Sequence, residues 1–235
     1  MQMSFWDHLE EFRSRLIKIV IVVGVMTLLS FWMADWMLAW LLKLAPAQNQ
    51  SLVSLQPASV FVQSMRLSLI SGVVLAFPIL LYQLWAFISP GLSQKEVKVF
   101  IIALYGGTCL FILGLLFAYF FVIPTALSFF WDYSKSLGIQ PTWTIDHYIN
   151  FVLMFLLSFG LAFELPIILI LLVWLKIISA KSLSEKRPYI IVVLAIAAAI
   201  LTPPDVVSQV MLLIPLWLLY EISVFISKRF DKFAP

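Results

Sequence analysis

Long apolar runs are the feature of this 235-residue sequence that most restricts its fold. A transmembrane helix needs about 20 consecutive apolar residues, so a run of about 18 or more with few charges predicts one. Four segments meet this criterion well: 16–42, 67–88, 99–123 and 148–175. Hydrophobic residues make up 63% of the chain and charged residues 11%, whereas soluble domains have about 45–50% and about 25%. The chain has too little polar surface for a soluble globule, which excludes a cytosolic enzyme.

Two further runs are weaker. Segment 189–201 has only 13 apolar residues, enough for about 20 Å of a hydrocarbon core about 30 Å thick. Segment 210–226 is interrupted by Glu221. With both counted, we expect an all-α polytopic membrane protein with six transmembrane helices and a single integral membrane domain over 1–235. Because the runs differ in length, the long helices should tilt or protrude.

The basic residues favour one orientation of six spans. If the N-terminus lies in the cytoplasm, only Lys43, Arg66 and Lys135 of the 15 basic residues fall on the outer side. Cytoplasmic loops carry an excess of lysine and arginine, so both termini are expected inside. Without the fifth span, the basic cluster at 228–232 would lie outside.

Glu164 is the strongest polar anomaly. It lies twelve residues before Lys176, which places it about 18 Å from the inner boundary, near mid-bilayer. An ionised side chain there costs about 2.5–3.5 kcal/mol on insertion scales, and an intramembrane acid is a functional hypothesis by default. We expect a polar, water-accessible cavity around it, although a protonated structural glutamate also fits the pattern. Pro166 should add a kink by removing a backbone donor.

Two acids should lie on the cytoplasmic face. Ser4 and Asp7 have the spacing of a capping box that starts a helix, and on this helix Glu11 can pair with Arg15, four residues on. Glu96 stands where the third span begins and meets the positive end of the helix dipole. Both acids therefore have an ordinary structural explanation. Alternatively, two carboxylates on one face could receive two guanidinium groups through charge-assisted, bidentate contacts.

The segment 201–205, Leu-Thr-Pro-Pro-Asp, is the expected outer turn between the two short spans. Consecutive prolines, Pro203 and Pro204, prevent a continuous helix, and Asp205 can cap the next one. We interpret the turn as a rigid hairpin. Prolines inside spans two, four and six predict kinks, and Gly114 in span three predicts close helix packing.

No catalytic or metal-binding pattern is present in the sequence. Cys109 is the single cysteine, and the two histidines, His8 and His147, fall on opposite sides of the expected membrane. We therefore predict no enzyme activity and no cofactor. Three classes are considered: a receptor for peptides, a proton- or cation-coupled small-solute transporter using Glu164, and an intramembrane hydrolase, which lacks a nucleophile–base pair.

A family resemblance rests on several segments taken together. The segments are 8–16 (HLEEFRSRL), 82–92 (YQLWAFISPGL) followed by Glu96, 163–166 (FELP), 186–189 (KRPY) and 201–205 (LTPPD). In this order, across nearly the whole chain, they resemble the TatC family, the membrane receptor of the twin-arginine protein translocase. Phe12 stands where the family pattern has leucine, which is an exchange of one apolar residue for another.

The resemblance implies a cupped bundle of six spans in the bacterial plasma (inner) membrane, with both termini cytoplasmic. It also implies recognition of folded cargo through the Arg-Arg pair of its signal peptide. Carried over by position, Glu11 and Glu96 would meet this pair and Arg13 would support the site. Glu164 would be the buried polar residue facing the concavity.

The resemblance further implies partners and an energy source. Spans five and six would dock small single-span subunits of the TatA and TatB type, with Pro203, Pro204, Asp205 and Gln209 in structural or docking roles. Membrane lipid and further copies of the chain are expected partners, and nucleic acid is not. Transport would be driven by the protonmotive force, without nucleotide hydrolysis by this subunit.

Overall fold

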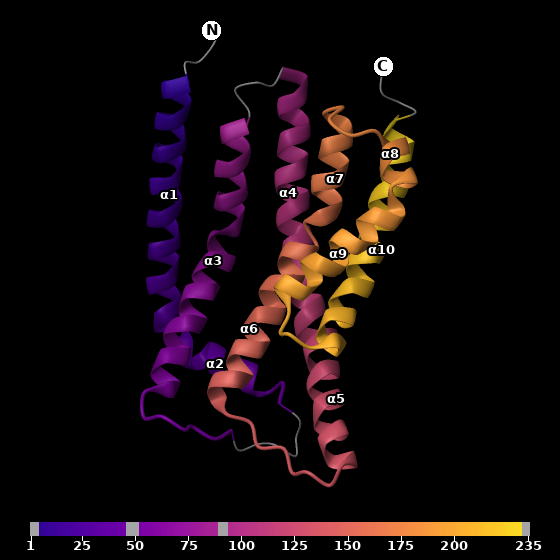
Figure 1. Cartoon of the computed structure of the whole chain (residues 1–235). Helices are drawn as coiled ribbons and strands as arrows, with labels where there is room; N and C mark the ends of the chain where they lie inside the picture. Colours follow the sequence, from indigo (N-terminus) through magenta and orange to yellow (C-terminus); the bar gives the residue numbers. More distant parts are fainter. Residues whose placement is uncertain (1–4, 46–51, 89–93, 232–235) are drawn as a thin grey trace. The chain divides into compact units, whose positions relative to one another are not determined.

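The computed structural model describes residues 5–45, 52–88 and 94–231. The described part is built from helices, with one isolated bridge between Val53 and Thr144 (Figure 1). The helices are α1 (Phe5–Trp32), α2 (Ala34–Leu42), α3 (Ser59–Ile88), α4 (Gln94–Phe117), α5 (Ile123–Ser136), α6 (Ile145–Ala162), α7 (Leu165–Trp174), α8 (Ala180–Glu185), α9 (Arg187–Leu201) and α10 (Val206–Asp231), with a π turn, η2 (Ala118–Val122), between α4 and α5. The expected all-α class is confirmed.

Five helical stretches are long and apolar enough to cross a membrane: His8–Trp32, Ser59–Phe87, Phe100–Ser136, Ile145–Trp174 and Val206–Arg229. The predicted fifth span corresponds to α9, which is apolar but has only 15 residues. At 1.5 Å per residue it is about 22 Å long, which is shorter than a hydrocarbon core of about 30 Å. The multi-pass architecture is confirmed, and so is the unequal length of its helices.

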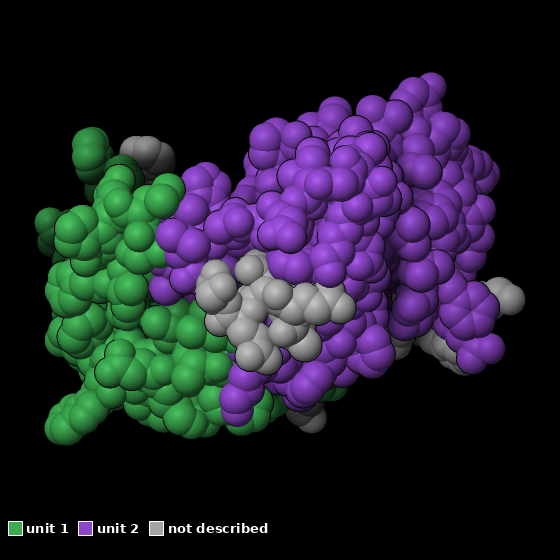
Figure 2. Space-filling model, turned by 90° about the horizontal axis from the view of Figure 1, so that it is seen from below, with its two compact units in different colours: residues 1–42, 54–108 green, residues 43–53, 109–235 purple. Residues whose placement is uncertain are grey.

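The described chain forms two compact units, coloured green and purple in Figure 2. Unit 1 comprises residues 1–42 and 54–108, and unit 2 comprises residues 43–53 and 109–235. The boundary falls inside α4, so residues 94–108 of this helix belong to unit 1 and residues 109–117 to unit 2.

Unit 1 is organised by the packing of α1 on α3. Gly72 of α3 lies so close to Thr27 of α1 that a Cβ on the glycine would be 2.6 Å from the Thr27 backbone nitrogen. A single helix over 16–42 was predicted, but the structure divides it at Met33 into α1 and α2. The amide of Met33 donates to Ser30 O, an i→i−3 bond that tightens the last turn of α1.

The helix that was predicted to end at residue 123 continues to Ser136. Pro124 cannot donate the i→i−4 bond that a regular helix requires. The π turn η2 precedes it, and the amide of Ile123 donates to Ala118 O, five residues back. Such a turn inserts extra backbone without ending the helix, so α4, η2 and α5 form one apolar stretch.

Pro166 acts as predicted, because the fourth span is broken directly before it. Helix α6 ends at Ala162, and α7 begins at Leu165 with the proline in its first turn. Phe163 and Glu164 therefore form a short non-helical link in the middle of an apolar stretch. In contrast, α3 and α10 continue through their internal prolines, Pro78 and Pro215.

The core of unit 2 contains several large aromatic side chains among aliphatic ones. Phe111 of α4 packs against α6, where a Cβ on Gly160 would be 2.7 Å from the phenylalanine ring. A Cβ on Gly114 would be 2.4 Å from Phe159 O, which confirms the predicted close packing at this glycine. On the other side of the unit, α10 packs against α7, α8 and α9, and the buried Tyr220 hydroxyl donates to Leu183 O at 2.6 Å.

Candidate functional site

The first candidate group lies where the start of α1 meets the end of α3 in unit 1. Glu11 pairs with Arg15 as predicted: the Arg15 Nε and Nη2 atoms donate to Glu11 Oε1 at 3.0 and 2.5 Å. A further guanidinium nitrogen, Nη1, donates to Gln83 Oε1 on α3 at 3.2 Å. Glu11 Oε2 is buried and has no hydrogen-bond partner within the described residues. One carboxylate oxygen is therefore engaged, and the other is left for an additional donor.

Aromatic packing holds this end of α1 against α3. The His8 ring stacks on Phe87 with centroids 4.3 Å apart, and Phe12 contacts the same ring edge-on at 5.6 Å. Neither Phe87 nor Gln83 was identified from the sequence as a site residue. The segment 82–92 could have indicated them, because both residues lie in it, within one and a half turns of α3.

The two other predicted members of this group have different surroundings. Arg13 is exposed and lies 3.7 Å from Glu10, so in this structure its ionic neighbour is not Glu11. Glu96 is in the first turn of α4, but its side chain lies outside the described part of the chain. Ser4 and the side chain of Asp7, which were predicted to form a capping box, also lie outside it.

Glu164 lies in the link between α6 and α7. Only 6% of the residue is exposed, and its Oε1 atom is buried without a hydrogen-bond partner among the described residues. The backbone is better satisfied, because the amide of Glu164 donates to Leu161 O and its carbonyl accepts from Ile168. The burial differs from the open, water-accessible surroundings that were expected. The side chain is instead a polar group with unmet hydrogen-bonding capacity in an apolar region.

The turn between α9 and α10 forms the hairpin that was predicted. Asp205 Oδ1 accepts a hydrogen bond from the Ser208 amide at 2.7 Å, which confirms Asp205 as the cap of α10. Gln209 ties the two helices together, since its Nε2 donates to Ala195 O at 3.0 Å. Pro203 and Pro204 separate the two helices.

An ion pair links α9 and α10 at the opposite end of this hairpin, and it was not predicted from the sequence. Arg187 Nη2 of α9 donates to Glu221 Oε2 of α10 at 2.7 Å. Glu221 interrupted an apolar run, which was the signal that it needed a partner. Within 5–45, 52–88 and 94–231, no three His, Cys, Asp or Glu side chains are grouped closely enough to hold a metal ion.

Comparison with known proteins gives consistent results. Residues 7–215 match the family described as Sec-independent protein translocase protein (TatC). The Sec-independent protein translocase protein TatC of Carboxydothermus hydrogenoformans is 37% identical over 227 residues, covering 96% of this chain and 93% of that protein. The protein of the same name from Aquifex aeolicus is 39% identical over 229 residues, covering 96% and 95%.

The fold is also similar to a solved structure. A crystal structure of the twin-arginine translocase receptor TatC in DDM matches with a TM-score of 0.84 and 39% sequence identity. The match covers 94% of this chain and 99% of the crystallised chain.

Proposed function

Because the chain belongs to the TatC family of Sec-independent protein translocase proteins, we propose that it is the subunit that binds the Arg-Arg pair of export signal peptides. TatC is a translocase component and not a catalytic enzyme, and the chain spans the membrane several times. Family membership therefore decides between a protein translocase and the small-solute transporter that Glu164 alone also suggested.

The main support for this proposal is the hydrogen bonding of the Glu11 carboxylate. Its Oε1 atom already accepts from Arg15, while its buried Oε2 atom has no partner within the described residues. A buried carboxylate oxygen without a donor is unfavourable, so a guanidinium group that reaches it gains a charge-assisted hydrogen bond. Arg15 is itself held by Gln83, so the acid keeps its position while a ligand binds.

Glu96 supplies the second carboxylate in this proposal. It lies in the first turn of α4, only eight residues beyond the end of α3 at Ile88. Helix α3 contacts the Glu11–Arg15 pair through Gln83, and Figure 1 shows the start of α1, the end of α3 and the start of α4 at the same end of unit 1. Two acids match two arginines, whereas lysine would not reproduce the planar fork of each guanidinium. Arg13 is proposed to support the site from the exposed face of α1.

We assign the site to the cytoplasmic side of the bacterial plasma membrane. The excess of lysine and arginine on one set of loops supports cytoplasmic termini, and a signal peptide approaches from that side before export. Transport is proposed to draw on the protonmotive force.

Helices α9 and α10 are proposed to dock single-span subunits of the TatA and TatB type. Apolar side chains of α10 are exposed at intervals of four residues, which places them along an oblique stripe of the helix. They are Val206, Val210, Ile214, Leu218 and Ile222. The hairpin bonds of Asp205 and Gln209 keep this stripe rigid, and Glu164 of the same unit offers an unsatisfied carboxylate to an assembled partner. Further copies of the chain are expected in the same assembly.

Site-specific photocrosslinking tests the receptor function. A photoreactive residue at the exposed Leu9 should capture a peptide with Arg-Arg and not its Lys-Lys counterpart. Glu11→Gln and Glu96→Lys should each abolish capture while the protein remains inserted.

Glu10→Gln is the matched control, because Glu10 is a neighbouring acid on the same helix and is exposed to solvent. It should leave capture unchanged. Capture that persists in both Glu11→Gln and Glu96→Lys, or that is equal for the Arg-Arg and Lys-Lys peptides, would disprove the assigned site.

A further inference from the structure

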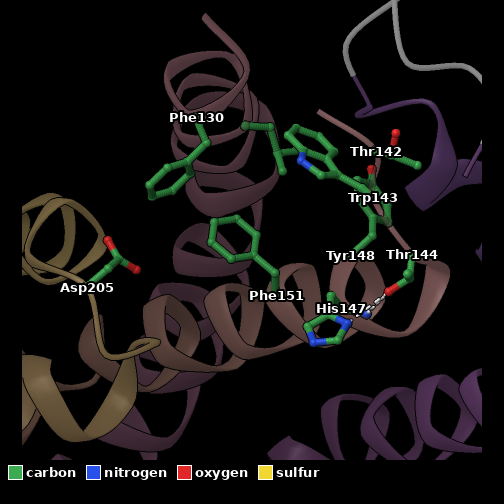
Figure 3. Close-up of a pocket in the computed structure, with 9 residues that line it drawn as sticks. Phe130, Thr142, Trp143, Thr144, His147, Tyr148, Phe151 and Asp205 are labelled. Carbon is green, nitrogen blue, oxygen red and sulfur yellow. Dashed lines mark hydrogen bonds between the residues drawn. The ribbon is translucent and has the colours of Figure 1, made fainter. Parts of the chain in front are cut away.

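A cavity of about 540 Å³ lies in unit 2, at the ends of its membrane-spanning helices (Figure 3). This volume is within the range of about 300–1,000 Å³ found for small-molecule sites. Its residues come from α5, from the segment leading into α6, from the first turns of α6, and from the α9–α10 turn. None of the roles assigned above uses this cavity.

The walls of the cavity are aromatic. Phe130 and Phe151 meet edge-on with ring centroids 6.1 Å apart, and Trp143 stacks near Tyr148 at 6.4 Å. Such faces attract cations, because each ring carries negative potential above its plane. Tryptophan and tyrosine are also enriched at the level of lipid headgroups, and these residues lie at the start of the apolar stretch Ile145–Trp174.

Asp205 supplies the charge of the cavity. Its Oδ1 atom caps α10, but Oδ2 has no partner within the described residues. Figure 3 shows the carboxylate directed towards the rings of Phe130 and Phe151. No lysine or arginine is among the lining residues. A cation held between this acid and the two rings would therefore gain both a charge-assisted hydrogen bond and cation–π contacts.

Hydrogen-bond donors lie elsewhere on the lining. His147 Nδ1 is 2.9 Å from Thr144 Oγ1, and when it accepts the threonine proton, Nε2 carries a hydrogen that is free to donate. Thr142 adds a hydroxyl group. The wall is held in place because Val53 exchanges backbone hydrogen bonds with Trp143 and Ile145 at 3.0 and 3.1 Å.

We propose that this cavity binds the headgroup of phosphatidylethanolamine. The ammonium group lies against Asp205, Phe130 and Phe151, and the phosphate accepts from His147. A primary ammonium suits the site better than a quaternary one, since only the former can donate a hydrogen bond to Asp205 Oδ2.

Native mass spectrometry of the full chain in detergent tests the proposal, with phosphatidylethanolamine and phosphatidylglycerol of identical acyl chains as probes. We expect the ethanolamine lipid to bind more tightly. Asp205→Asn should weaken its binding about tenfold, the size of one lost hydrogen bond to a charged group. Asparagine remains a good helix cap, so α10 should keep its start. Asp132→Asn, an exposed acid on α5 outside the lining, is the control and should bind as the unaltered chain does.

Equal binding of the two lipids, or unchanged binding in Asp205→Asn, overturns the proposal. The bound lipid would then be nonspecific lipid around the membrane-spanning surface. If Asp205→Asn does not fold, the unaltered chain is photolabelled with a headgroup-diazirine phosphatidylethanolamine. Adducts on 127–151 or 202–205 support the site, and adducts confined to other segments refute it. Phosphatidylcholine that binds as tightly as phosphatidylethanolamine refutes the hydrogen bond to Asp205.

Discussion

Replacing Gly72 by alanine should destabilise unit 1 by forcing α1 and α3 apart. The added Cβ would lie 2.4 Å from Thr27 Oγ1, 2.6 Å from its backbone nitrogen and 2.7 Å from its Cα. Ordinary contacts begin near 3.4 Å. The Thr27 hydroxyl can rotate away, but the backbone nitrogen and Cα can retreat only if the helices separate locally by about 0.7–0.8 Å. A gap of about 0.5–1 Å already removes a quarter to a half of the dispersion energy of the atoms facing it.

The size of the effect follows from measured overpacking. Extra methyl groups in close-packed interiors cost about 1–3 kcal/mol. For a chain of 150–250 residues, each kcal/mol lowers the melting temperature by about 2–4 °C, so we expect a decrease of about 2–12 °C. Circular dichroism of the detergent-solubilised protein during heating measures this change.

Gly24→Ala is the matched control, because it makes the same substitution on α1 at a position with no atom within 4 Å of the new Cβ. It should melt at the original temperature or slightly above, since alanine favours helix more than glycine does. Adding Thr27→Ala to Gly72→Ala should not restore stability, because the clashing nitrogen and Cα atoms remain. Equal melting of both glycine variants, or rescue by Thr27→Ala, would refute the argument.

Three further predictions concern unit 2, each measured by thermal unfolding in detergent unless stated. Arg187→Glu and Glu221→Arg should each lower the free energy of unfolding, by only about 1 kcal/mol because the pair is partly exposed. The double exchange should restore stability. If it does not, the pair does not hold α9 against α10. Asp205→Ala should lower the free energy of unfolding by about 1 kcal/mol and speed hydrogen exchange at the Ser208 amide, whereas Asp205→Asn should do neither. Equal exchange rates in the two variants would show that Asp205 does not cap α10. Glu164→Gln should leave stability unchanged or raise it, since the carboxylate Oε1 has no partner among the described residues. A decrease of more than about 2 kcal/mol in the free energy of unfolding would reveal an ionic partner within the chain.

The existence of the helices followed from hydropathy, but their ends did not. Apolar runs correctly located six helical segments, five of which are long enough to cross a membrane, because burial in lipid requires every backbone group to be bonded within the segment. The break at Met33 and the continuation through Pro124 depend on local hydrogen bonds, Met33 N to Ser30 O and Ile123 N to Ala118 O. A hydropathy pattern contains no information about such bonds, so the first span was drawn too long and the third too short.

Side-chain pairs within one helix turn could be predicted, whereas the partner of a polar side chain on another helix could not. The Glu11–Arg15 pair and the Asp205 cap follow from spacings of four and three residues, which the helix geometry fixes. Gln83 and Arg15 are 68 residues apart in the sequence, and Arg187 and Glu221 are 34 residues apart. These partners depend on which helices pack together and in which register.

Two acids that interrupt apolar runs look alike in the sequence, yet their surroundings separate their roles. Glu221 has Arg187 at 2.7 Å, so its charge is compensated within unit 2 and it stabilises the α9–α10 hairpin. Glu164 is 6% exposed, and its Oε1 has no partner in the described chain. A buried polar atom without a partner costs about 1–3 kcal/mol, so Glu164 does not stabilise the isolated subunit. Nothing within the described part of the chain offsets this cost, which makes Glu164 and not Glu221 the residue to examine in the assembled translocase.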